Sequence, residues 1–296
     1  MTPDLIIAGA PKCGSTSLFG WIASHPGVCA SSVKETYFLM DEGYPLFRTE
    51  NNIHKSGIQG YDVFFNHCIK EKKFLLEATP DYLYQKTALE VISSLLLSSK
   101  VLFILRKPSD RVFSLYQFAK NNVSVLPKNI GFREFVEEIM GGGTQDFVRN
   151  RPILQQAIHH SQYVDYLEQW VSRLGERVHV VFFEDMRDNP KGFMMKLSAQ
   201  LGLDTACFEE FNYSAKNQTY TVKHQAFHKF KRKLSKILPG GEYRQSLRDI
   251  YAMLNTQASS KKTPGDIEVL KMLDLHFSGY NKRLENLLDI ELPAWK

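Results

Sequence analysis

A chain of 296 residues is long enough for one α/β domain with a full core, or for two small domains at most. Its net charge of +5 suits an anionic ligand, but it is too small to indicate a nucleic-acid partner. No apolar stretch reaches the roughly 18 residues that cross a bilayer, and the N-terminus shows no signal-peptide pattern. We therefore expect a cytoplasmic protein without a membrane span.

Apolar runs bounded by turn residues predict strands, each followed by helix-like sequence. The predicted strands are Leu5–Ala8, Phe74–Glu77, Val101–Leu105 and Val178–Phe183. The predicted helices are Thr16–Ser24, Lys86–Leu96, Ser109–Asn121, Phe132–Met140, Ile153–Arg173 and Pro190–Leu201. This alternation predicts an α/β fold with a doubly wound parallel sheet. We expect one domain over residues 1–296, with a helical C-terminal portion from about residue 207.

The first predicted strand runs directly into a turn, Gly9–Gly14, and then into a helix start. Backbone N–H groups at a helix N-terminus are unpaired and bind anions without special side chains. Lys12 adds a charge to this loop, and hydroxyl groups follow it at Ser15, Thr16 and Ser17. The pattern predicts a loop that holds a phosphate.

This loop differs from that of kinases and ATPases in two ways. Ser15 occupies the usual lysine position after the second glycine, and the lysine lies earlier, at Lys12. The strand Val101–Leu105 ends in Arg106, where an aspartate that orients magnesium is expected. These departures favour a nucleotide phosphate bound without a metal.

Two segments resemble motifs of sulfotransferases that use 3′-phosphoadenosine 5′-phosphosulfate (PAPS). Gly9–Leu18 resembles their 5′-phosphosulfate loop, and Val101–Tyr116 resembles their 3′-phosphate motif. In the second motif Arg106 closes a strand and Ser114 follows eight residues later. The resemblance implies PAPS as cofactor, with no metal required. It assigns cofactor binding to Lys12, Cys13, Gly14, Ser15, Thr16, Ser17, Arg106, Ser114 and Tyr163.

Further segments resemble the heparan-sulfate-type and bacterial branch of this family. They are Lys34–Phe38, Leu76–Tyr82, Ser161–Trp170 and Asn281–Trp295. One departure is Ala78, which stands where the heparan-type enzymes have a lysine that supports catalysis. Tyr37 stands where a histidine or glutamine is common. The resemblance therefore implies sulfuryl transfer without implying heparan sulfate as the acceptor.

The same resemblance makes Glu35 the general base and Lys12 the residue that stabilises charge on the leaving phosphate. A carboxylate over a desolvated cleft has a raised pKa and accepts a proton readily. We therefore expect Glu35 to deprotonate the acceptor, with in-line attack on sulfur. The alternative is a surface salt bridge between Glu35 and Lys34.

The acceptor is predicted to be a hydroxyl or amine of a glycan or a small natural product. Tyr37, Phe38 and Tyr82 are expected to line its cleft. Gly141–Gly143 is the clearest break in the chain and is either a lid over the acceptor or an ordinary loop. The oligomeric state is left open.

The four cysteines are scattered, without a C-x-x-C pair, so we expect neither a disulfide framework nor a zinc site. They are Cys13, Cys29, Cys68 and Cys207. Within the phosphate loop, Cys13 is interpreted as a small filler. The alternative is a nucleophile with a low pKa.

Two further sets of charged residues have open interpretations. A basic cluster follows residue 222, and we prefer a solvated helix face for it. The alternative is that Lys216 or Lys223 completes the cofactor site. Glu184 and Asp185 follow a predicted strand, where we prefer a structural role over metal binding.

Two other functions remain as alternatives. One is a nucleotide-dependent kinase or NTPase with a degenerate loop, which Arg106 opposes. The other is a protein that binds PAPS or its product, adenosine 3′,5′-bisphosphate (PAP), without turnover, which Ala78 favours.

Overall fold

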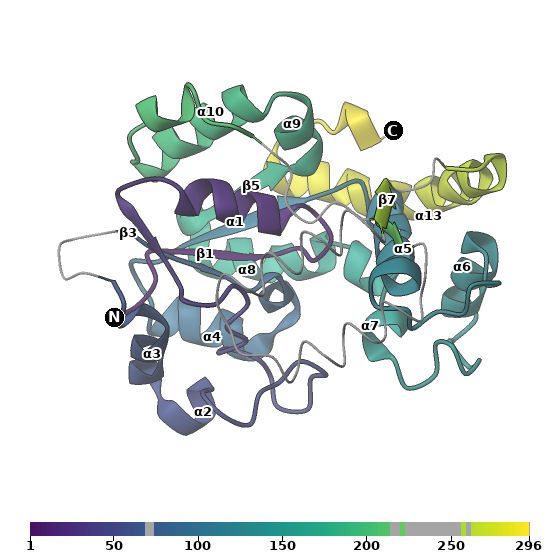
Figure 1. The fold of residues 1–296 in the computed structure, drawn as a ribbon, viewed down its shortest axis with the longest axis horizontal. Helices are drawn as coiled ribbons and strands as arrows, with labels where there is room; N and C mark the ends of the chain where they lie inside the picture. The colour runs from purple at the N-terminus through teal and green to yellow at the C-terminus, as the bar shows by residue number, and fades with distance from the viewer. Residues whose placement is uncertain (69–73, 214–219, 223–255, 259–261, 296) are drawn as a thin grey trace. The chain divides into compact units, whose positions relative to one another are not determined.

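A computed structural model describes residues 1–68, 74–213, 220–222, 256–258 and 262–295 (Figure 1). The chain divides into two compact units. The first comprises Met1–Arg111, His159–Lys216 and Asp274–Lys296, and the second comprises Val112–Ile158 and Asn217–Leu273. The single domain expected over residues 1–296 stays a prediction.

The first unit is built on a five-stranded parallel sheet with the strand order β2-β3-β1-β4-β5. The strands are β1 (Leu5–Gly9), β2 (Val28–Ala30), β3 (Phe74–Ala78), β4 (Lys100–Leu105) and β5 (Val178–Phe182). Every residue of the central strand β1 is buried, as expected of a parallel strand covered on both faces. The predicted α/β parallel sheet is confirmed. The edge strand β2 is not among the strands predicted from the sequence.

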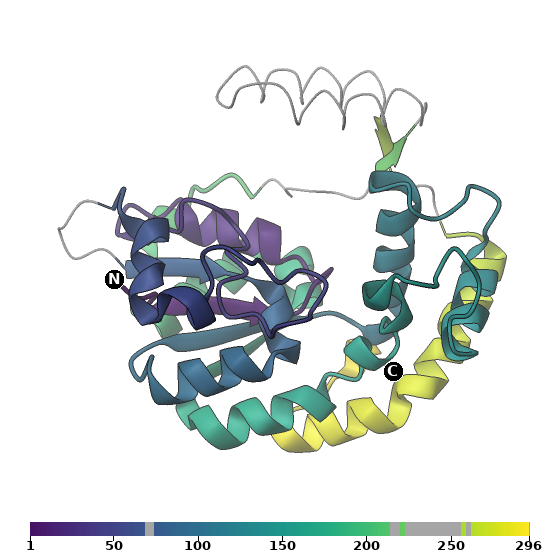
Figure 2. The same ribbon diagram turned by 90° about the horizontal axis from the view of Figure 1, so that it is seen from below.

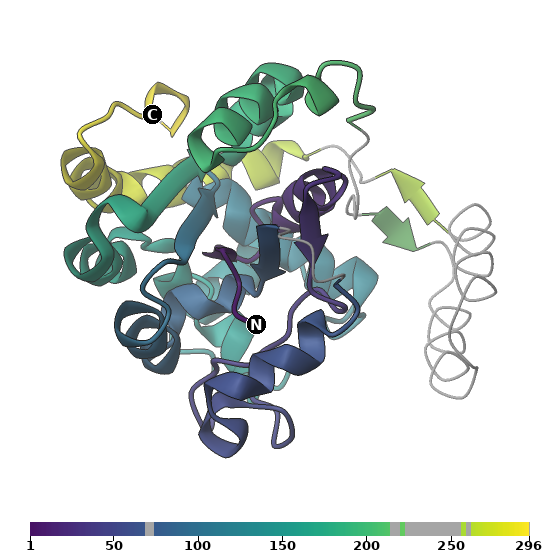
Figure 3. The ribbon, with the colours of Figure 1, turned by 90° about the vertical axis from the view of Figure 1, so that its left-hand side faces the viewer.

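Helices cover both faces of this sheet. On one face lie α1 (Ser15–Ala23), α9 (Phe183–Asp188) and α10 (Pro190–Leu201) (Figures 1 and 3). On the other face lie α4 (Lys86–Ser94) and α8 (Val164–Leu174), which run side by side (Figure 2). The sequence of α8 explains its placement, because Leu167, Trp170 and Leu174 repeat at three- and four-residue spacing and are all buried.

The single helix predicted at Ile153–Arg173 is wrong. The structure has α7 (Pro152–Gln155), a 3₁₀ turn (His159–Ser161) and then α8. Tertiary contacts stabilise the break, because the His160 ring stacks on Tyr84 with centroids 3.8 Å apart, and the Ser161 hydroxyl accepts a hydrogen bond from Arg111. Apolar periodicity alone did not reveal these contacts.

The segment between β2 and β3 contains three short helices, α2 (Ile53–Ser56), η1 (Ile58–Tyr61) and α3 (Asp62–Phe65). It is tied to the turn η2 (Pro80–Tyr84) that follows β3. The Tyr82 hydroxyl accepts hydrogen bonds from the backbone N–H groups of Phe38 (3.0 Å) and Leu39 (3.1 Å). Phe38 and Tyr82 are fully buried. The prediction that they line an acceptor cleft is therefore wrong, because both side chains belong to the core.

Short 3₁₀ turns complete the first unit: η5 (Gly175–Arg177), η6 (Ala206–Phe208) and η7 (Pro293–Trp295). Two long helices contribute residues to both units, α5 (Pro108–Gln117) and α13 (Pro264–Leu288). Helix α13 is the longest described element of the C-terminal portion, which also contains two short strands. Among the residues described, no helix combines the length and the apolarity that crossing a bilayer requires.

The second unit contains the π-helical turn η3 (Phe118–Asn122), α6 (Phe132–Met140), and the antiparallel pair β6 (Tyr220–Val222) and β7 (Thr256–Ala258). Its core includes the Tyr116 ring, which lies 5.3 Å from that of Phe132 and 5.5 Å from that of Phe135. Gly142 and Gly143 follow α6 with positive φ, so Gly141–Gly143 ends the helix. Its role as a lid stays a prediction.

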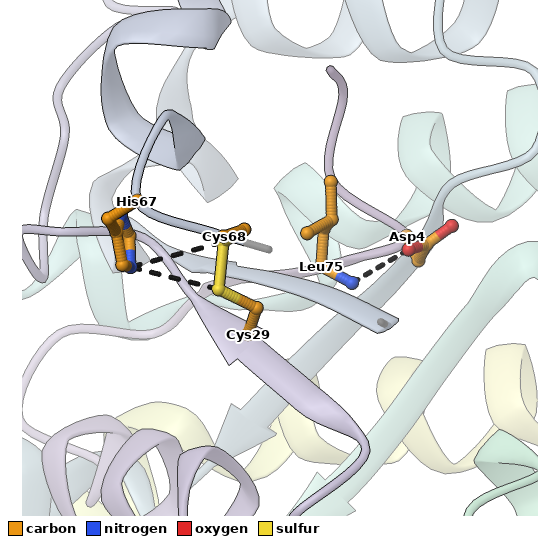
Figure 4. Close-up of a disulfide and its surroundings, with 5 residues drawn as sticks. All are labelled: Asp4, Cys29, His67, Cys68 and Leu75. Atoms are coloured by element: carbon orange, nitrogen blue, oxygen red, sulfur yellow. Dashed lines mark hydrogen bonds between the residues drawn. A yellow bond between two sulfur atoms is a disulfide. The ribbon is translucent and has the colours of Figure 1, made fainter. Parts of the chain in front are cut away.

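Cys29 and Cys68 form a disulfide, so the expectation that the cysteines form no disulfide is wrong for this pair (Figure 4). Cys29 lies on β2 and pairs with Leu75 of β3, which draws the two chain segments together. The two Cα atoms are 6.0 Å apart, within the usual range for a disulfide. A separation of 39 residues hid this pairing in the sequence. Cys13 and Cys207 are free.

Candidate active site

The phosphate loop connects β1 to α1, and two glycines let it pass close to its neighbours. At Gly14 φ is +93°, and an added Cβ would lie 2.7 Å from Cε of Met186 and 2.8 Å from a ring carbon of Phe183. At Gly9 it would lie 2.8 Å from a ring carbon of Phe103. Gly14 is also the N-cap of α1 and provides no side chain for capping. The first turn of α1 is therefore arranged to bind an anion.

Positive charge gathers around this loop. Burial, followed by repulsion from Arg106 and Arg111, lowers the pKa of Lys12 to about 8. Lys12 also has a φ of +71°, a conformation that non-glycine residues adopt rarely and mostly at functional sites. An anion bound here relieves the repulsion, so the electrostatics fit the predicted phosphate.

Arg106, which follows β4, has a donor without a partner. Its Nε atom is buried and makes no hydrogen bond, while its guanidinium lies 4.7 Å from the centre of the Phe183 ring. A buried donor without a partner is costly unless a ligand satisfies it. This geometry fits the role of Arg106 in phosphate binding.

Arg111 links the phosphate loop to two other segments of the first unit, a role that the sequence analysis missed. Its side chain donates to the Pro11 carbonyl (3.0 Å), the Ser161 hydroxyl (2.8 Å) and the Tyr84 hydroxyl (3.1 Å). The guanidinium is buried and lies within the motif that the sequence analysis quoted for the 3′-phosphate. Its place five residues after Arg106 was the available signal.

Tyr163 also contacts the phosphate loop, through Cys13, and it contacts Arg106. The Tyr163 hydroxyl donates to the Arg106 carbonyl (2.9 Å) and lies 3.5 Å from the Cys13 sulfur, with the side chain only 2% exposed. Burial raises the pKa of the Cys13 thiol, which opposes the nucleophile alternative and favours the filler interpretation. Both side chains are buried, and their contact with a cofactor stays a prediction.

Glu35 occupies a strained loop at the edge of the first unit's sheet. Its φ is +67°, and its N–H donates to the Ala78 carbonyl at the end of β3 (2.8 Å). Its carboxylate binds the Lys34 ammonium (2.5 Å) and accepts a hydrogen bond from the Tyr37 hydroxyl (2.6 Å). Glu35 therefore forms the salt bridge with Lys34 and also lies within the candidate active site.

The pKa of Glu35 corrects our expectation. Burial alone raises it, but the Lys34 charge and the hydrogen bonds from Lys34 and Tyr37 outweigh burial and hold the pKa below its usual value. Lys12 contributes in the same direction, so the two predicted catalytic groups share one electrostatic environment. Glu35 is thus ionised and able to accept a proton at neutral pH.

Glu77, on β3, is a buried carboxylate to which the sequence analysis assigned no role. Its oxygens accept hydrogen bonds from the hydroxyls of Thr36 (2.5 Å), Thr79 (3.0 Å) and Tyr61 (2.9 Å). Burial raises its pKa. Because Thr36 follows Glu35 directly, this network anchors the loop that carries the candidate base. A charged residue inside the apolar run Phe74–Ala78 was the signal in the sequence.

A third carboxyl group, Asp81, lies in η2. It accepts a hydrogen bond from the Tyr44 hydroxyl (2.9 Å), and burial raises its pKa to about 6. The charge of Glu35 contributes to this rise. Glu35 is thus held by an ammonium and a phenol, whereas repulsion from Arg106 and Arg111 acts on Lys12.

The remaining predicted residues have different outcomes. Ser114 lies on α5 in the second unit, and its binding role stays a prediction. Lys216, Lys223 and the basic cluster after residue 222 lie outside the described residues. Glu184 accepts hydrogen bonds from the Lys107 N–H (3.0 Å) and from Nε1 of Trp295 (3.2 Å), which fits the preferred structural role.

Residues 2–248 match the model of the sulfotransferase domain family. The chain belongs to this family. The predicted sulfotransferase identity is confirmed at this level. The bifunctional heparan sulfate N-deacetylase/N-sulfotransferase 3 of Homo sapiens is 23% identical over 99% of the chain. The bifunctional heparan sulfate N-deacetylase/N-sulfotransferase 4 of Mus musculus is 24% identical over 99% of the chain.

The two curated relatives are longer than this chain. The chain spans 31% of each of the two curated relatives, so it corresponds to a part of them. A sulfotransferase from Alicyclobacillus acidocaldarius matches the whole chain with a TM-score of 0.69, 99% of its own chain covered and 21% identity. This structural similarity shows that the two chains share a fold.

Proposed function

We propose that this sulfotransferase moves a sulfuryl group from PAPS to a hydroxyl or amine. The observation that carries the proposal is the unpartnered, buried Nε of Arg106 beside a lysine whose pKa is lowered by burial and neighbouring cations. An unsatisfied guanidinium donor and a lysine close to a helix N-terminus suit a ligand with more than one phosphate. Family membership adds independent support.

On the cofactor side, the first turn of α1 and Lys12 hold the phosphosulfate end. Lys12 stabilises negative charge on the oxygen that leaves sulfur, the type of electrostatic contribution that usually dominates such transfers. Arg106 holds the 3′-phosphate. Since ATP lacks this group, Arg106 favours PAPS over ATP.

On the acceptor side, Glu35 takes the proton from the acceptor hydroxyl or amine. The acceptor atom then bonds to sulfur as the bond between sulfur and the phosphate oxygen breaks, and PAP leaves with the electron pair. The Ala78 carbonyl and the Glu77 network keep Glu35 in place. Positioning supplies a large share of the rate enhancement.

The acceptor class is a glycan or a small molecule with hydroxyl or amine groups. The curated relatives are named as heparan sulfate N-sulfotransferases, which makes a glycan amine one acceptor to include. Ala78 replaces the family lysine, so the sulfuryl group depends here on Lys12 and the loop. Tyr37, half-buried beside Glu35, is the predicted acceptor contact that keeps access to solvent.

The first experiment is a calorimetric titration of the purified protein with PAP, and separately with ATP and magnesium. We expect tight binding of PAP without metal and weak binding of ATP. Arg106→Ala should weaken PAP binding about 10- to 100-fold, because a hydrogen bond to a charged group contributes about 1.5–3 kcal/mol.

Arg187→Ala is the matched control, since Arg187 is exposed and pairs only with neighbouring Asp188. It should leave PAP affinity unchanged. A preference for ATP with magnesium, or equal PAP affinity in Arg106→Ala and the wild type, would overturn the proposal.

A further inference from the structure

Away from the candidate active site, three side chains with metal-binding chemistry meet at the edge of the sheet. Cys29 comes from β2, and His67 and Cys68 come from the end of the segment that precedes β3. Their ligand atoms lie within 4.8 Å of one another (Figure 4). This is the one such group among the residues described.

The position of the imidazole is the informative feature. Nε2 of His67 lies 3.7 Å from the Cys29 sulfur and 3.9 Å from the Cys68 sulfur. In a tetrahedral zinc site, with Zn–N of about 2.0–2.1 Å and Zn–S of about 2.3 Å, nitrogen and sulfur are separated by about 3.6 Å. The imidazole therefore lies close to zinc-site separation from both sulfurs.

We propose that the reduced form of this chain binds one zinc ion through Cys29, His67 and Cys68, and that the disulfide and the zinc site are alternative states. Only the two sulfurs have to move apart, to about 3.8 Å in a tetrahedral site. Rotation about the side-chain bonds of the two cysteines supplies this movement. Because His67 is exposed, zinc has a route from solvent, and water completes the coordination.

The change between the two states is balanced with an external dithiol as reductant. The dithiol gives two electrons and two protons to the Cys29–Cys68 bond, which opens to two thiols, and becomes a disulfide itself. Zinc then replaces the two thiol protons, which pass to solvent. A ligand such as zinc maintains a cross-link in a reducing environment, where disulfides rarely persist.

The location gives this cross-link a structural role. β2 is an edge strand of three residues, and it leads directly into the Ser31–Glu35 loop. Either state links β2 to the segment before β3, whereas a reduced and metal-free chain loses this link. Zinc binding therefore adds to the folding stability of the reduced form.

The test uses the full chain in two forms. The protein is reduced with a phosphine or left oxidised, then mixed with zinc in excess, desalted without oxygen and analysed for metal by mass spectrometry. We expect about one zinc per reduced chain and none above background in the oxidised form. Cobalt(II) in place of zinc should give thiolate charge-transfer absorption in the reduced form alone.

His67→Ala should weaken zinc binding at least about tenfold, because even groups that only orient a ligand change metal affinity 10- to 100-fold. Cys29→Ser should abolish binding, and Cys207→Ser is the matched control that should retain it, since Cys207 is free and separate. Zinc retention by reduced wild type equal to that of Cys29→Ser overturns the proposal, as does unchanged affinity in His67→Ala. These readouts are independent of sulfuryl transfer.

Discussion

The cofactor end and the acceptor end of the candidate site differ in their electrostatics. At the cofactor end, Lys12 and Arg106 lie near a helix N-terminus, with a buried donor left unsatisfied at Arg106. At the acceptor end, hydroxyl groups of neighbouring residues already satisfy Glu35 and Glu77. One end needs an anion to complete it, and the other is complete without a ligand.

This difference shows how each end of the candidate site is prepared for its ligand. Cations crowded together raise the free energy of the empty site, and the bound phosphates recover that energy. A carboxylate held by a lysine and a phenol is already oriented, so binding an acceptor costs little reorganisation. The comparison predicts that changes at the acceptor end affect the chemical step more than cofactor binding.

The largest expected effect is that of Glu35→Gln. Removing a general base lowers transfer about 10²- to 10⁴-fold, whereas PAP affinity should stay unchanged because the cofactor end is intact. Transfer is measured at pH 7 by mass spectrometry of products from a panel of amine and hydroxyl acceptors, and affinity by calorimetry. Glu42→Gln, on the exposed part of the same segment, should behave like the wild type. Wild-type transfer by Glu35→Gln would show that another group takes the proton.

Next in size is Glu77→Ala. The loss leaves three buried hydroxyls without their acceptor, so we expect the free energy of unfolding to fall by about 3 kcal/mol. Urea denaturation measures this change. Glu90→Ala, at an exposed position on α4, should stay within about 0.5 kcal/mol of the wild type. Equal stability of the two variants would contradict the anchoring role of Glu77.

A smaller effect concerns the pH dependence of the cofactor end. The charged ammonium is the binding form of Lys12, and it is lost as pH rises through the pKa of about 8. PAP affinity should therefore weaken up to about tenfold between pH 8 and pH 9. In Lys12→Arg the charge persists, so affinity should be flat over this range. Calorimetry at stepped pH compares the two, and parallel profiles would argue against Lys12 as the titrating group.

The smallest effect is expected from Tyr37→Phe. The variant removes a hydrogen bond that favours the ionised form of Glu35, so the pKa of that carboxyl rises. The loss of activity on acidification should then begin at a higher pH than in the wild type. Tyr44→Phe is the control, because the Tyr44 hydroxyl donates to Asp81 instead. An acid limb that stays in place in Tyr37→Phe would show that Glu35 does not set it.

The cofactor end was the more predictable from sequence, and the reason is local. Gly9, Gly14 and Lys12 belong to one short loop, and Arg106 follows a strongly apolar strand, so their spacing along the chain carries the information. Parallel strands place their carboxyl ends at one edge, which brings such residues together without further knowledge of the fold.

The acceptor end depends on contacts between distant segments, which no spacing records. Thr36 meets Glu77 across 41 residues, and Tyr44 meets Asp81 across 37. The lowered pKa of Glu35 follows from the side chains around it, so burial alone gave the wrong direction. The Cys29–Cys68 bond likewise follows from the β2–β3 pairing, which the sequence did not reveal.

The hydrogen bond from Trp295 to Glu184 has a consequence for how the site matures. Glu184 also accepts from the N–H of Lys107, directly beside Arg106, and the Trp295 ring lies 6.0 Å from that of Tyr163. During synthesis on the ribosome, β1, β4 and β5 all emerge long before residue 295 does. The support around Arg106 is therefore complete only after residue 295 has emerged, so nascent chains that already contain the whole sheet still lack part of the candidate phosphate site.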